Sequence, residues 1–67
     1  MKFKSGDRVR MQDGDRYAHG EVTIVRINDG FIRNIPNDAI ICKVMFDEDW
    51  APHYWYYPET DLENESA

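Results

Sequence analysis

Apolar and polar residues alternate along this chain with the two-residue period of β-strands, and no stretch has the period of a helix. Val9 and Met11 alternate with arginines, and residues 21–27 are rich in β-branched side chains, which favour strands. Residues 39–46 and the aromatic stretch 53–57 predict two further strands. Turn signals separate these segments by 8–12 residues or so, as in small all-β sandwiches and barrels.

The segments between the strands contain recognisable turn residues. Residues 12–15 and Asn28-Asp29-Gly30 combine Asp with Gly, a strong hairpin signal. Residues 31–35 predict a short arm that ends at Pro36, and Pro58 begins a single helical turn over residues 59–62. Closure removes exposed sheet edges, so we expect an all-β barrel of about five short antiparallel strands with a terminal helical turn. The expected core consists of Val9, Val22, Ile24, Val44, Phe46 and Leu62.

Composition and charge narrow the class of protein. The chain has 67 residues, enough for one small domain, and a net charge of −5. Residues 1–43 contain all eight Lys and Arg, whereas residues 44–67 contain seven acids and no base. Such an acidic composition argues against a nucleic-acid-binding protein, because affinity for phosphates depends on clustered Lys and Arg. No apolar run approaches the roughly 20 residues that span a bilayer, and Cys42 is the only cysteine, so we expect a cytoplasmic protein without membrane association or disulfides.

Two segments resemble SH3-like barrels, a superfamily that includes Tudor, chromo-barrel and KOW domains. Residues 3–10, Phe-Lys-Ser-Gly-Asp-Arg-Val-Arg, are similar to the opening of many such domains. Residues 44–47 and 57–63 are similar to the last two strands, which end on a short turn and a buried leucine. The resemblance implies one SH3-like barrel over residues 1–62, followed by a disordered acidic tail at 63–67. The overall shape also resembles the photosystem I peripheral subunit and type II dihydrofolate reductases, but the Val-Gln-Ile-Tyr stretch of those reductases is absent.

An aromatic cluster is the sharpest local feature, because five of the nine aromatic residues lie between residues 50 and 57, beside the acidic residues 47–49. Strand alternation places residues 53, 55 and 57 on one face and residues 54 and 56 on the other, so both sets cannot be core. Exposed aromatic patches mark interfaces, although the same rings also supply bulk to a small core. The candidate partner-binding residues are Tyr17, Asp47, Asp49, Trp50, Tyr54, Trp55 and Tyr56. The Tudor and chromo-barrel resemblance implies a methyl-lysine cage formed by Tyr17, Trp50, Tyr54 and Trp55.

Residues for catalysis or metal binding are sparse. His19 and His53 are far apart in the chain, and no second cysteine accompanies Cys42 to form a zinc site. Ser5 and Ser66 lack a neighbouring base of the kind that activates a nucleophile. We therefore expect no enzyme, no metal site and no cofactor.

These observations favour a small adaptor or regulatory module, a monomer or weak homo-oligomer, that binds a protein with a basic or cationic segment. Its size and architecture also suit a phage or mobile-element protein that acts on a host protein. The alternative is a KOW-like binder of nucleic acid or the transcription machinery. Its basic face would consist of Lys2, Lys4, Arg8, Arg10 and Arg26.

Overall fold

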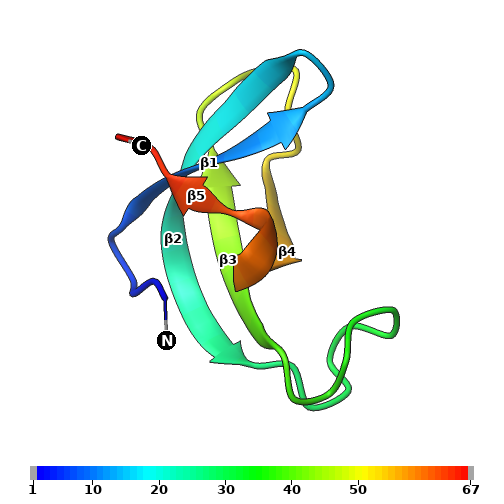
Figure 1. Ribbon diagram of the computed structural model, residues 1–67. Helices are drawn as coiled ribbons and strands as arrows, with labels where there is room; N and C mark the ends of the chain where they lie inside the picture. The colour runs from blue at the N-terminus through cyan, green and yellow to red at the C-terminus, as the bar shows by residue number, and fades with distance from the viewer. Residues whose placement is uncertain (1, 67) are drawn as a thin grey trace.

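The computed structural model describes residues 2–66 as one antiparallel sheet with a single 3-10 turn (Figure 1). The elements are β1 (Arg8–Asp13), β2 (Arg16–Ile27), β3 (Ile40–Phe46), β4 (Tyr54–Pro58), η1 (Glu59–Asp61) and β5 (Glu63–Asn64). The order in the sheet is β4-β3-β2-β1-β5, so β1 to β4 form a meander and β5 returns to pair with β1. The predicted all-β class, the five antiparallel strands and the terminal helical turn are confirmed, and the curved sheet is compatible with a small barrel-like fold.

One hydrophobic core lies on the inner face of this sheet. Its buried members are Phe3, Val9, Val22, Cys42, Val44 and Leu62. Met11, Val25, Phe46 and Tyr57 are partly buried and pack against them. The core predicted at Val9, Val22, Val44 and Leu62 is confirmed, Phe46 lies at its margin, and the prediction for Ile24 is wrong.

A β-bulge in β2 explains the position of Ile24. Val22 pairs with Val44 of β3, but the next paired residue of β2 is Ile24, opposite Lys43. Thr23 is therefore an extra residue, and it reverses the alternation of inward and outward side chains. Val25 packs against the core as a result, while 42% of Ile24 is exposed on the outer face.

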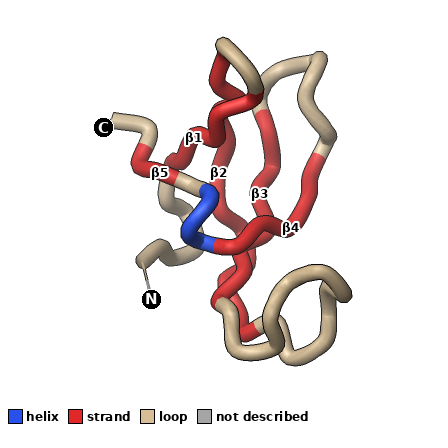
Figure 2. The backbone as a smooth tube through the Cα atoms, turned by 45° about the vertical axis from the view of Figure 1, so that its right-hand side comes forward, coloured by secondary structure: helices blue, strands red, loops and turns tan. Residues whose placement is uncertain are grey.

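The loop of residues 28–39 projects beyond the sheet (Figure 2) and is organised around Asn28, a fully buried polar residue. The two N–H bonds of the Asn28 side-chain amide are shared among the carbonyl oxygens of Ile32, Ile35 and Pro36, at 3.0, 2.7 and 3.2 Å from Nδ2. Its Oδ1 accepts one from the Ile32 N–H at 2.7 Å. The predicted turn at 28–30 is present, with φ of 46° at Asp29 and 82° at Gly30. It opens a long loop rather than a two-residue hairpin.

The C-terminal residues differ from the predicted disordered tail as far as Ser66, while Ala67 lies outside the described residues. Glu63 and Asn64 form β5, and the Arg10 Nε donates to Glu63 Oε1 at 2.7 Å. The domain therefore continues past residue 62. The hydrophobic pattern of the sequence could not predict this segment, because the segment is polar. It pairs with the free backbone groups of β1, and its carboxylates neutralise the arginines of β1.

Candidate functional site

Strand β4 lies at one edge of the sheet and presents aromatic side chains to both faces. On the inner face, Tyr57 packs edge-on against Phe46, with the ring centroids 5.8 Å apart. Trp55 also faces inward, because it pairs with buried Val44, yet 53% of its side chain is exposed. No strand pairs with the outer edge of β4, so the core does not cover the Trp55 indole.

On the outer face, Tyr54 and Tyr56 are packed with residues from other segments. The Lys43 Nζ lies 4.3 Å from the centroid of the Tyr54 ring, which is 45% exposed. Phe31 reaches back from the loop and packs edge-on against Tyr56, with centroids 4.9 Å apart. The loop therefore supplies an aromatic residue to the outer face of the sheet.

Trp50 lies in the segment that connects β3 to β4. The guanidinium of Arg16, at the start of β2, stacks 3.5 Å from the centroid of the Trp50 ring. Beside it, an open hollow of about 510 Å³ is lined by Phe46, Asp47, Glu48, Asp49, Ala51 and His53. Trp50 is thus held against the β1–β2 hairpin rather than among the aromatic side chains of β4.

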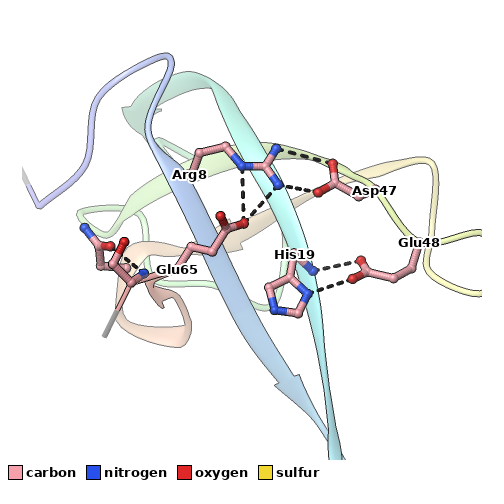
Figure 3. Close-up of polar contacts among 7 residues, drawn as sticks. Arg8, His19, Asp47, Glu48 and Glu65 are labelled. Atoms are coloured by element: carbon pink, nitrogen blue, oxygen red, sulfur yellow. Dashed lines mark hydrogen bonds and ion pairs between the residues drawn. The ribbon is translucent and has the colours of Figure 1, made fainter.

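The acids of this segment are largely engaged within the protein (Figure 3). Asp47 forms a two-point ion pair with the Arg8 guanidinium, which also donates to Glu65 at 2.9 Å. Glu48 accepts from the backbone N–H of His19 at 2.8 Å and lies 2.7 Å from the His19 Nδ1. The bonds from Arg8 lower the pKa of Asp47, and those from His19 lower the pKa of Glu48. Asp49 has no ion pair among residues 2–66.

The residues of the predicted basic face are similarly engaged. Lys4 pairs with Asp7 at 3.6 Å, and Arg10 pairs with Glu63 while its guanidinium stacks 4.2 Å from the Tyr17 ring. The Lys2 ammonium donates to a backbone carbonyl at 3.2 Å. Arg26 differs: its guanidinium lies 4.7 Å from the Phe31 ring and has no ion pair in the described part of the chain.

The predicted partner-binding residues therefore occupy several settings. Tyr17 lines a small hollow with Gln12 and residues 60–63, beside η1. Tyr54 and Tyr56 lie on the outer face, Trp55 on the inner face, and Trp50 on the connecting segment. Sequence reasoning missed Ile24 and Phe31, two exposed apolar residues that flank the outer side chains of β4. Their positions depend on the bulge and on the folded loop, for which the sequence carried no clear signal.

Burial raises the pKa of the Cys42 thiol to about 11, which makes it a poor nucleophile. No three His, Cys, Asp or Glu side chains in residues 2–66 are grouped as metal ligands. The same residues include no helix with the length and apolar character needed to cross a membrane.

Comparison of the chain with protein-family models, curated proteins and solved structures gives no match.

Proposed function

We propose that this chain is a non-enzymatic protein-binding module built on an SH3-like barrel. One observation carries the proposal: the edge strand β4 leaves large aromatic side chains about half exposed on both of its faces, Tyr54 on one and Trp55 on the other. Aromatic residues are enriched at protein interfaces, where they supply much of the binding energy. Their exposure in so small a domain is costly unless a partner covers them.

The charge arrangement bears on the kind of ligand. A nucleic-acid binder would need several free cations on one face, but Lys4, Arg8 and Arg10 each form an ion pair with a carboxylate. A partner with a basic segment would need free acids beside Trp50, but Asp47 and Glu48 already bind Arg8 and His19, which leaves Asp49 as the one acid of residues 47–49 without an ion pair among residues 2–66. The ion pairs therefore favour neither a nucleic acid nor a basic segment as the ligand. They leave a partner that contacts the aromatic residues of β4.

The test is affinity selection from a random-peptide display library, with the wild-type protein and the Tyr54→Ala/Trp55→Ala variant as baits. We expect the wild type to enrich a family of related peptides. The variant should bind those peptides at least about tenfold more weakly, because it lacks an aromatic anchor on each face of β4. Ile27→Ala is the control, since Ile27 is 52% exposed but lies at the far end of β2. Failure to enrich any peptide family, or equal binding by the double variant, would refute the proposal.

A further inference from the structure

The outer face of β2, β3 and β4 carries a continuous group of apolar and cationic side chains. The strand pairing places Ile24, Lys43 and Tyr56 side by side across the three strands. Tyr54 and Arg26 flank this row, and Phe31 of the loop contacts both Tyr56 and Arg26. We call this group the outer patch; it consists of Ile24, Arg26, Phe31, Lys43, Tyr54 and Tyr56. Ile24, Phe31 and Tyr54 are its most exposed apolar members.

The side chains of the outer patch are held in place before any partner arrives. The Lys43 ammonium lies over the Tyr54 ring at 4.3 Å, and the Arg26 guanidinium lies over the Phe31 ring at 4.7 Å. Such cation–π contacts restrict long side chains that would otherwise lose rotamer freedom on binding. The β-bulge in β2 adds to this arrangement, because it turns Ile24 outward beside Lys43. Bulges often re-aim a side chain at functional positions.

The outer patch contains two cations, Arg26 and Lys43, although the protein as a whole is acidic. The chain as a whole has a net charge of −5, and Lys4, Arg8, Arg10 and Arg16 all pair with carboxylates. Within residues 2–66, Arg26 and Lys43 form no ion pair, and the same holds for Lys2 and Arg33, which lie outside the outer patch. The charges of Arg26 and Lys43 are therefore available to carboxylates from outside the molecule.

We infer that the outer patch docks an acidic segment of a partner protein, with apolar side chains on Ile24 and Tyr54 and carboxylates on Arg26 and Lys43. This inference rests on the proposed function and specifies its surface and its partner. Charge complementarity selects the partner, because the carboxylates of an acidic segment are attracted to these two cations. A nucleic acid fits less well, since the two cations of the outer patch neutralise too few phosphates.

Variants of the outer patch test the inference with the peptides selected by the wild-type protein. We expect the enriched peptides to combine Asp or Glu with aromatic or aliphatic residues. Arg26→Glu and Lys43→Gln should each weaken binding by about tenfold, and Ile24→Ala by about fivefold. Matched controls are Lys4→Glu, which changes the charge by the same amount as Arg26→Glu, and Ile27→Ala. Both controls should bind within about twofold of the wild type, because neither residue belongs to the outer patch.

The possible outcomes separate this inference from the proposed function. Enriched peptides that are basic, or whose binding is unaffected by the Arg26, Lys43 and Ile24 variants, would overturn the inference and leave the protein-binding function standing. If no peptide family is enriched, both fail. Tight binding of a labelled oligothymidylate that requires Arg26 and Lys43 would overturn the inference in favour of a nucleic-acid ligand. Amide chemical shifts of the folded variants provide the check that each retains the native sheet.

Discussion

At the scale of single residues, Asn28 stands out because it is polar and yet buried. Its side chain is fully buried and forms four hydrogen bonds to the backbone of the loop that follows. A buried polar group is tolerated when its partners are satisfied, and it becomes costly when one side of the arrangement is removed. The hydrogen bonds of Asn28 therefore stabilise the loop in the way that apolar contacts stabilise a hydrophobic core. They also fix the segment that contains Phe31.

Replacement of this residue is the first prediction. Asn28→Ala leaves three carbonyl oxygens and one N–H of the partly buried loop without their partner, so we expect the free energy of unfolding to fall by about 2–4 kcal/mol. Urea denaturation followed by tryptophan fluorescence measures the change. Asn34→Ala, at an exposed position of the same loop, should change stability by less than about 0.5 kcal/mol. Equal effects of the two variants would show that the Asn28 hydrogen bonds do not support the fold.

At the scale of elements, the strands were predictable where an alternating pattern runs without interruption. The segments 8–13, 40–46 and 54–58 could be assigned because periodicity and turn residues agree there. The bulge at Thr23 could not be foreseen, since β-branched residues run on through it and give no sign of the change in alternation. Nor could β5, which is two polar residues long and forms only because β1 offers an open edge.

The candidate partner-binding residues were also predictable only in part. The alternation of aromatic residues in β4 follows from sequence, and the structure has Tyr57 facing inward while Tyr54 faces outward. The engagement of Asp47 by Arg8 could not be foreseen, because the two residues are 39 positions apart. The contribution of Phe31 depends on the fold of a long loop, which local patterns do not specify.

The bulge leads to a second prediction, which compares neighbouring residues of β2. Val25→Ala should destabilise the protein by about 1–2 kcal/mol, because Val25 packs against the core. Ile24→Ala should change stability by less than about 0.5 kcal/mol, although isoleucine is the larger residue. Thermal or urea unfolding of both variants measures the two changes in stability. The reverse order would place Ile24 in the core and contradict the bulge.

At the scale of the whole molecule, Arg8 joins three parts of the chain. From β1 it forms ion pairs with Asp47, after β3, and with Glu65, after β5. A neighbouring pair, His19 with Glu48, fixes the segment after β3 to β2. These polar contacts link segments that are far apart in the sequence, which matters in a domain with so small a core.

A pH dependence follows from the lowered pKa of Asp47. Because Arg8 stabilises the ionised carboxylate in the folded state, its contribution is present above the ordinary carboxyl pKa, near 4, and is lost as the pH falls through the lower folded value. The contribution of this largely exposed pair is at most about 1 kcal/mol. Asp47→Asn should therefore destabilise the protein at pH 6 and have less effect at pH 3. Urea midpoints at both pH values measure this, with Asp49→Asn as the control; a pH-independent effect of Asp47→Asn would contradict the assignment.

The return of β5 to β1 has a consequence for the order in which the chain folds. The β1–β2 hairpin closes through a short turn, whereas Arg10 must find Glu63 across 53 positions of sequence. Contacts between distant residues form late, because the entropy of closing the intervening chain has to be overcome first. We therefore expect the meander of β1 to β4 to form before β5 is added. We expect the same two-residue edge strand to open first in the folded protein, so that its backbone amides exchange hydrogen with solvent faster than those of β2 and β3.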